Sequence, residues 1–276
     1  MHPAEQAATA AVTSMAHGQL PATHVGRAER AVQLWEYFAL QLHFAEVVAA
    51  KTALPLVDVV EQYTNLYKRF GFGIWPDTPR VPEWYHYTAH LQTLATHDER
   101  LAWTQAFYAQ LPPERLPAGR QQFGCFGCDV PDAEGRVKIH FTNYDSDGTS
   151  PLGRAKIDAR RQDLHALFTH VQHTNGEAAQ SVLGESWLYH LDAYRRLFPP
   201  VYGESRVMQT STAHVQGQTC WGQFIDHRSA VRPALRVQLL ANLATLDMAR
   251  LWEVFPLPTY RVQAPIQAFY DWYQVT

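Results

Sequence analysis

Residues 137–198, VKIHFTNYDSDGTSPLGRAKIDARRQDLHALFTHVQHTNGEAAQSVLGESWLYHLDAYRRLF, contain the pattern that decides the fold. The stretch begins with VKIHF, in which apolar and polar residues alternate as they do in a half-buried strand. A turn-rich segment follows, and Asp158 is then a plausible N-cap for a helix. One face of that helix is apolar, with helical spacing of Leu164, Leu167, Phe168 and Val171.

The stretch closes with a second strand and a short helix. SVLGESWLY (181–189) predicts the strand, and AYRRLF (193–198) predicts a helix that the prolines at 199 and 200 stop. Two strands joined by a helical crossover normally lie parallel in one sheet, with a right-handed connection. The stretch therefore predicts a βαβ unit.

Cations gather at the start of the predicted helix, where four stand within eight residues: Arg154, Lys156, Arg160 and Arg161. Cations are unfavourable there, because a helix N-terminus already carries about half a positive charge. Helix N-termini after glycine-containing loops are natural phosphate sites, and Gly148 and Gly153 flank the candidate loop. We therefore expect these residues to bind the phosphates of a cofactor. The alternative is a basic face exposed to solvent, which is the usual role of a charge run.

Composition limits the class of protein. The 276 residues are 46% hydrophobic and 18% charged, which suits one large or two modest globular domains. A net charge of −3 argues against bulk nucleic-acid binding. Apolar runs are too short to span a bilayer, and the N-terminus lacks the features of a signal peptide. Three cysteines do not suggest a disulfide framework, so we expect a cytoplasmic protein. From the net charge and the short apolar runs we expect neither a nucleic-acid nor a membrane partner.

The chain is expected to divide near residue 119. Residues 1–24 show no sustained period and predict a loosely ordered tail. Residues 25–118 predict a helical domain, with helices at 27–53, 57–70, 83–95 and 99–111. Residues 119–276 predict a mixed α/β domain. After the βαβ unit we expect strands at 206–214, 219–225 and 258–264 and helices at 233–246 and 266–273.

Two groups of potential metal ligands occur. Cys125 and Cys128 form a CxxC pair, but structural zinc needs two further ligands and the chain has one other cysteine. Glu83, His86 and His90 share one face of a predicted helix, as ligands do in di-iron carboxylate bundles. The sequence has one clear Glu-x-x-His copy where such a bundle needs two, so we expect no metal. A metal-dependent oxidase of the helical half is the third functional hypothesis.

The second strand carries a candidate acid–base group. Glu185, Trp187 and Tyr189 would share one side of that strand, and a carboxylate among aromatic rings can have its pKa raised, as a general base requires. His140 on the preceding strand would lie close by if the strands are neighbours. Tyr194 in the following helix is a candidate proton donor. The alternative role for these residues is an ordinary buried hydrogen bond.

The order of elements in residues 137–198 resembles the core of the GNAT-type (GCN5-related) N-acyltransferases. In that family a strand leads to a pyrophosphate-binding loop and helix, then to a strand splayed from the first. A helix that often bears a proton-donating tyrosine follows. The run SWLYHLDAYRRLFPPVYGES (186–205) also looks like part of a divergent GNAT-like C-terminal domain found after a helical N-terminal domain.

The resemblance implies an α+β fold, in which a helical N-terminal domain precedes a GNAT-like mixed α/β domain. It implies CoA-dependent acyl transfer to a small amine or hydroxyl, with acetyl-CoA or another acyl-CoA as the donor. Glu185 or His140 would deprotonate the acceptor, Tyr194 would protonate the leaving thiolate, and the cations would hold the phosphates.

The chain departs from the family at the phosphate loop, because no Arg/Gln-x-x-Gly-x-Gly/Ala string stands between residues 142 and 161. The second hypothesis is therefore a non-catalytic small-molecule-binding or interaction protein on the same fold. The sequence does not specify the acyl group, the acceptor or the oligomeric state.

Overall fold

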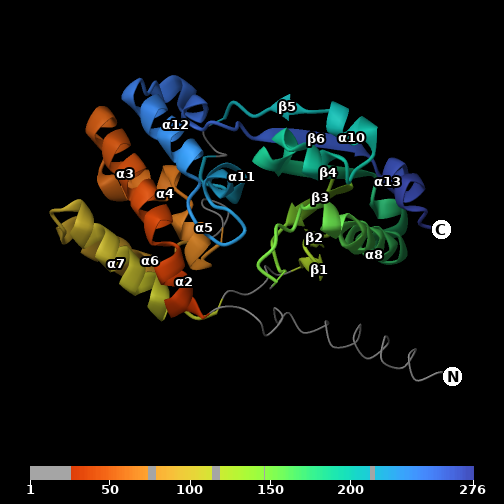
Figure 1. Cartoon of the computed structure of the whole chain (residues 1–276), viewed down its shortest axis with the longest axis horizontal. Coiled ribbons are helices and arrows are strands. Elements are labelled where there is room, and N and C mark those ends of the chain that lie inside the picture. The colour runs from red at the N-terminus through yellow and green to blue at the C-terminus, as the bar shows by residue number, and fades with distance from the viewer. Residues whose placement is uncertain (1–25, 74–78, 114–118, 146, 212–214) are drawn as a thin grey trace.

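The computed structural model describes residues 26–73, 79–113, 119–145, 147–211 and 215–276. The fold is mixed α+β, as the sequence predicts, with helices in the N-terminal part and strands in the C-terminal part. Figure 1 shows a helical half beside a half built on a sheet. The predicted tail at 1–24 lies outside the described residues. Among those residues, no helix combines the length and apolar character that crossing a bilayer needs.

The described N-terminal helices are α2 (Arg27–Gln33), α3 (Trp35–Thr52), α4 (Leu56–Tyr63), α5 (Leu66–Phe70), α6 (Pro82–Thr93) and α7 (His97–Gln110). The two helices that the sequence predicts at 27–53 and 57–70 are each broken in two. The second break falls at Thr64, whose backbone is extended and whose hydroxyl donates to the Val60 carbonyl. The α7 helix begins with a capping box, in which Thr96 and Glu99 satisfy each other's backbone amides.

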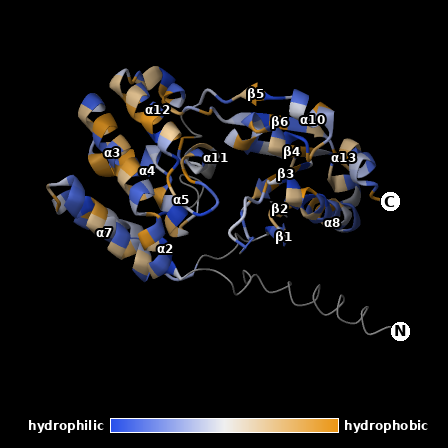
Figure 2. Ribbon diagram, viewed as in Figure 1, coloured by the Kyte–Doolittle hydropathy of each residue, from blue (hydrophilic) through white to orange (hydrophobic). Residues whose placement is uncertain are grey.

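A distant segment completes the core of the helical half. It contains α11 (Gln218–Trp221), a 3-10 turn (Gly222–Phe224), α12 (Pro233–Ala244) and a second 3-10 segment (Met248–Val254). Trp221 packs edge-on against Phe44 of α3, with ring centroids 5.1 Å apart, and its indole nitrogen donates to the Tyr63 carbonyl at 3.1 Å. Figure 2 shows apolar and hydrophilic residues intermixed along α3 and α12, as in amphipathic helices that bury one face.

The strand predicted at 219–225 is wrong, since residues 219–224 belong to α11 and the 3-10 turn, and Ile225 forms only an isolated bridge with Val231. Trp221 and Phe224 lie three residues apart and both enter the helical core. A short apolar run suits a buried helix as well as a strand, and here packing against the helical half decides between them.

The sheet has the strand order β1-β2-β3-β4-β6-β5. Its strands are β1 (Gln121–Phe123), β2 (Phe126–Cys128), β3 (Arg136–Phe141), β4 (Ser181–Ser186), β5 (Val207–Met208) and β6 (Tyr260–Pro265). The β3–β4 pair is parallel, as the βαβ pattern predicts, and the other pairs are antiparallel. The sequence pattern does not predict β1 or β2, and the strands predicted at 181–189 and 206–214 are longer than β4 and β5. Residues 212–214 of the predicted strand at 206–214 lie outside the described residues.

Helices cover one face of the sheet. They are α8 (Ile157–Asn175), α9 (Asp192–Arg195), α10 (Pro200–Glu204) and α13 (Ile266–Tyr273). Alternate strand residues, including Val137, Ile139, Val182 and Val262, join Leu164 and Phe168 of α8 in one apolar core. The α8 and α13 helices pack side by side, as Figure 1 shows. The side chains on the opposite face of the strands lie outside this core.

The parallel strands β3 and β4 separate soon after they begin. They pair over three residues each, and the last pair joins Lys138 to Leu183. Beyond it, β3 follows β2 as far as Phe141, and β4 follows β6 as far as Ser186. The result is a divergence of the two central strands towards their C-terminal ends.

Backbone directions at this divergence follow from the neighbouring hydrogen bonds. Successive residues of a strand direct their backbone amide and carbonyl groups to opposite sides. The Lys138 carbonyl accepts from Asp129 on the β2 side, so Phe141, three residues later, directs its amide towards β4. The Gln180 carbonyl bonds to β6, so Glu185 directs its amide towards β3. Both amides lie beyond the last paired residues of β3 and β4.

Candidate functional site

Two of the four cations at the start of α8 are paired with carboxylates. Arg160 is buried, and its Nη2 lies 3.1 Å from Asp145 Oδ1 while its Nε lies 3.1 Å from Asp163 Oδ2. Lys156 Nζ lies 2.5 Å from Asp147 Oδ2 and 3.2 Å from Asp145 Oδ2. The resulting hydrogen bonds and charges raise the pKa of Lys156 and lower that of Asp147. These two cations therefore neutralise carboxylates of the chain itself.

The other two cations have surroundings of a different kind. Arg154 and Arg161 are exposed, and within the described residues neither has an ion pair or a hydrogen bond from its side chain. Arg154 stands in a 3-10 turn just before α8, and Arg161 is one residue beyond Arg160 on the helix. They are the members of the predicted phosphate group whose charge is open to a ligand.

The two glycines of the predicted phosphate loop take part in local contacts. The Gly148 carbonyl accepts a hydrogen bond from His227 Nε2 at 3.1 Å. The Gly153 amide donates to the Ser150 carbonyl, and the Gly153 carbonyl accepts from the Lys156 amide, both at 3.0 Å. The loop is therefore closed by its own turns where it enters the helix.

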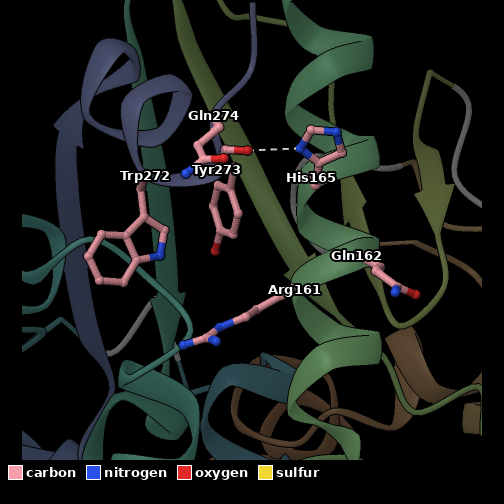
Figure 3. Close-up of a pocket in the computed structure, with 6 residues that line it drawn as sticks. All are labelled: Arg161, Gln162, His165, Trp272, Tyr273 and Gln274. Carbon is pink, nitrogen blue, oxygen red and sulfur yellow. Dashed lines mark hydrogen bonds between the residues drawn. The ribbon is translucent and has the colours of Figure 1, made fainter.

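A shallow pocket of about 320 Å³ lies between α8 and α13. Figure 3 shows Arg161 extending from α8 towards the rings of Trp272 and Tyr273. His165 Nδ1 donates to the Tyr273 carbonyl at 2.9 Å and joins the two helices. The Trp272 side chain is 43% exposed, so a flat indole face and a guanidinium border the same hollow.

The sheet face opposite α8 carries a row of polar residues. Five residues make up this group, which we call the polar row: Arg120, Asp129, Lys138, His140 and Glu185. Their order follows from register, because Asp129 continues β2 opposite Lys138 and Arg120 precedes β1 opposite Asp129. Side chains at alternate positions of a strand share a face, so the row crosses four strands on one side of the sheet.

Short polar contacts connect the polar row in two groups. His140 Nε2 donates to Asp129 Oδ2 at 2.7 Å, and Arg120 Nε donates to Asp129 Oδ1 at 2.9 Å. Lys138 Nζ lies 2.8 Å from Glu185 Oε2. The bonds from His140 and Arg120 outweigh burial and hold the pKa of Asp129 well below its usual value. Burial lowers the pKa of His140, and the charges of Arg120 and Lys68 lower it further, while Asp129 opposes them.

The structure brings two of the predicted catalytic residues together on one face and puts the third on the other. Glu185 and His140 both belong to the polar row and lie beyond the last paired residues of their strands. Tyr194 is buried on the α8 side, where its ring lies 5.7 Å from that of Phe141 and 6.3 Å from that of Phe126. Burial raises the pKa of Tyr194 well above its ordinary value, so its hydroxyl keeps its proton at neutral pH.

The aromatic neighbours predicted for Glu185 are placed differently. Residues Trp187–His190 form a 3-10 helix rather than the end of a strand. Tyr189 consequently turns to the α8 side, where its hydroxyl lies 3.0 Å from that of Tyr202. The expectation that Tyr189 shares a strand side with Glu185 is wrong, because the strand ends at Ser186.

The potential metal ligands are separated or occupied by other contacts. His90 and His86 pack against the Trp103 ring, with centroids 4.4 and 5.6 Å away. Cys125 and Cys128 are buried free thiols. In the part of the chain that the structure describes, no three His, Cys, Asp or Glu side chains gather as metal ligands would.

Sequence reasoning did not find Asp129 or Asp163. Asp129 follows a three-residue strand of Phe, Gly and Cys, which gives too short a pattern to recognise. Asp163 looks like an ordinary helix-surface residue, yet it accepts from the Cys125 amide at 3.1 Å. The Phe-Gly-Cys-Phe segment (123–126) is the available signal, because a glycine between apolar residues suggests a hairpin turn.

Comparison with known proteins gives no relative: no family model, curated protein or solved structure matches the chain.

Proposed function

We propose that this protein is a CoA-dependent acyltransferase whose acceptor is a small amine or hydroxyl. The divergence of β3 and β4 carries the proposal. It follows the arrangement that the sequence resemblance implies, in which a helix joins two strands that splay apart. Unpaired strand edges can bind an extended amide-containing chain, such as the pantetheine arm of CoA, through main-chain hydrogen bonds. Phe141 supplies a backbone amide at this position, directed towards β4.

The chain supplies groups suited to each part of acyl transfer. A bound acyl-CoA brings an activated acyl group as a thioester. The Phe141 amide is directed into the divergence and suits the stabilisation of a carbonyl oxygen placed there. Tyr194 lies beside Phe141 and keeps its proton at neutral pH, as a donor to a departing thiolate requires. Glu185 and His140 on the other face are the candidates for deprotonating the acceptor.

The nucleotide end of the donor suits the pocket between α8 and α13. Arg161 offers a guanidinium for a phosphate, and the exposed Trp272 ring offers a stacking surface for adenine. Arg154 adds a second cation near the start of α8. Lys156 and Arg160 contribute less, because their charges are balanced by Asp145, Asp147 and Asp163.

Calorimetric titration with acetyl-CoA tests the proposal. We expect Arg154→Ala, Arg161→Ala and Trp272→Ala each to weaken binding by about five- to tenfold, since each removes one contact to the nucleotide end. Arg250→Ala is a matched control for the arginines, because Arg250 is exposed in the 3-10 segment at Met248–Val254. Trp35→Ala is the control for Trp272, since the two side chains are 39% and 43% exposed. Absence of acetyl-CoA binding to the unaltered chain would refute the proposal.

A non-catalytic binding protein is the second candidate. The ion pairs of Lys156 and Arg160 favour it, because they occupy cations that a phosphate would otherwise meet. This candidate expects a ligand to bind without being consumed. Release of free CoA thiol from acetyl-CoA, measured with primary amines as acceptors, separates it from acyl transfer.

A further inference from the structure

Asp129 and His140 form a carboxylate–imidazole pair on the sheet. The Asp129 backbone is fixed opposite Lys138, because its amide donates to the Lys138 carbonyl at 3.0 Å. From there its carboxylate reaches His140 Nε2 at 2.7 Å. An ionised carboxylate only accepts, so the Nε2 proton belongs to the imidazole and the neutral ring has its lone pair on Nδ1.

Arg120 fixes the carboxylate from its other side. Its Nε donates to Asp129 Oδ1 at 2.9 Å and its Nη2 donates to Oδ2 at 3.5 Å, so both carboxylate oxygens have partners. The Asp129 side chain is 35% exposed and that of His140 is 22% exposed, which leaves the ring partly open to solvent. Within the described residues, His140 Nδ1 has no hydrogen-bond partner.

Glu185 is differently placed. Its Oε2 lies 2.8 Å from Lys138 Nζ, so its negative charge has a cationic partner within the sheet. This ion pair engages the Glu185 carboxylate within the sheet, whereas His140 Nδ1 has no hydrogen-bond partner among the described residues. Of the two candidates on this face, His140 therefore has the lone pair better suited to accept a proton.

We infer that His140 is the general base of the proposed acyl transfer and that Asp129 is the residue that positions it. The inference rests on the proposed function. As the acceptor nitrogen or oxygen bonds to the acyl carbon, the carbon–sulfur bond breaks. The proton lost by the acceptor goes to His140 Nδ1, and the thiolate takes the proton of Tyr194. Asp129 holds the ring in the Nε2–H tautomer and stabilises the imidazolium that forms.

Charged groups from four elements lie around the imidazole. Asp129 and Arg120 belong to the β1–β2 hairpin, Lys68 of α5 acts from the helical half, and Lys138 and Glu185 of the polar row form an ion pair across β3 and β4. Arg120 and Lys68 favour the neutral ring, and Asp129 favours the protonated one. Removing the charge of Asp129 should therefore make His140 harder to protonate.

Diethyl pyrocarbonate tests the inference on the full chain, because it acylates unprotonated imidazole nitrogens and peptide mass spectrometry locates each modified histidine. We expect His140 to be modified at neutral pH. At an acetyl-CoA concentration ten times its dissociation constant, modification of His140 should slow about tenfold by mass action. The exposed His173 near the end of α8 is the internal reference and should react equally with and without acetyl-CoA.

The positioning role of Asp129 has its own readout. Asp129→Asn keeps a hydrogen-bond acceptor but loses the charge, so the pH midpoint of His140 modification should fall by about one unit. Asp132→Asn is the matched control on the following turn, where Asp132 Oδ2 lies 2.7 Å from Arg136 Nε. That variant should leave the midpoint unchanged. A purely structural Asp129 would alter the melting temperature without moving this midpoint.

The outcomes separate the two proposals. Failure of acetyl-CoA to bind in calorimetry overturns the acyltransferase function and the assignment of the base with it. Binding without protection of His140, or an unchanged midpoint in Asp129→Asn, overturns the assignment of the base and leaves acyl transfer standing.

Discussion

Arg160 shows how strongly the role of one residue depends on its neighbours. Its side chain is 5% exposed, and it lies between Asp145 on the loop after β3 and Asp163 on α8. Burying a charge is costly unless it is paired, so these groups depend on one another. The cation that the sequence assigns to a phosphate therefore also holds the loop against the helix.

Replacing Arg160 should be far more damaging than replacing Lys156. We expect Arg160→Ala to reduce the free energy of unfolding by about 2–4 kcal/mol, because it removes the buried cation that two partly buried carboxylates share. Lys156→Ala should cost clearly less, since its ion pair with Asp147 is more exposed and is screened by solvent. Urea denaturation of the two variants measures the difference. Equal losses of unfolding free energy in the two variants would show that the buried ion pairs of Arg160 stabilise the fold no more than the exposed pair of Lys156.

Stability should depend on pH through His140. The pKa of His140 is lower in the folded chain than its ordinary value of 6.5, so below that pH the unfolded chain binds more protons. The stabilisation is fully present above pH 6.5 and is lost as the pH falls. The unaltered chain should therefore lose stability on acidification faster than His140→Asn, by less than about 1.4 kcal/mol per pH unit, the limit for one proton. Urea denaturation at pH 7 and pH 5.5 measures this, and parallel losses in both proteins would contradict it.

At the scale of elements, the turn of the β1–β2 hairpin packs closely against α8, and a glycine in that turn makes room for the contact. Gly124 has a φ of +54°, and a Cβ placed there would lie 2.0 Å from Asp163 Oδ1. The Asp163 carboxylate can therefore approach the turn and accept from the Cys125 amide. This contact fixes the hairpin that carries Asp129 and Arg120.

Gly124→Ala should destabilise the protein by about 2–4 kcal/mol, because it adds a steric clash to the cost of a left-handed backbone. Gly148→Ala is the matched control, since Gly148 has a φ of +68° and no atom within 4 Å of its added Cβ. We expect the control to cost about 1 kcal/mol. Thermal unfolding followed by circular dichroism compares the two. A Gly124→Ala protein no less stable than Gly148→Ala would mean that the hairpin adapts freely.

At the scale of the molecule, the chain forms two apolar cores that do not follow the division at residue 119. Residues 215–255 belong to the core of the helical half, although they follow most of the sheet in sequence. The sheet closes without them, because β5 and β6 are antiparallel neighbours and the Gln209 amide donates to the Thr259 carbonyl at 2.8 Å. The helical half is therefore built from residues that precede β1 and from residues 215–255, which lie between β5 and β6 in sequence.

Two fragments test this organisation. Residues 119–276 alone should fail to unfold cooperatively, because the apolar side chains of α11 and α12 would lose their cover. Residues 119–210 joined to 258–276 by an Asn-Gly turn should give one cooperative thermal transition, since the turn connects adjacent antiparallel strands. Circular dichroism melting curves measure whether each fragment unfolds cooperatively. A cooperative transition in the longer fragment would show that residues 215–255 do not need the helical half.

The sequence by itself determined the α+β class and the longer elements with a clear period. Periodicity identified α8, α12 and the parallel strands β3 and β4, because spacing along the chain shows which residues of an element share a face. It did not identify β1 and β2, whose three-residue strands are too short to show a period.

Only the tertiary structure decided which residues contact one another across different elements. It paired Arg160 with carboxylates, placed Asp129 beside His140, put Tyr194 on the opposite side of the sheet and turned residues 219–224 into helix. These outcomes depend on contacts between residues far apart in the chain. Local spacing contains no information about such contacts, because burial and charge pairing are settled when the elements pack together.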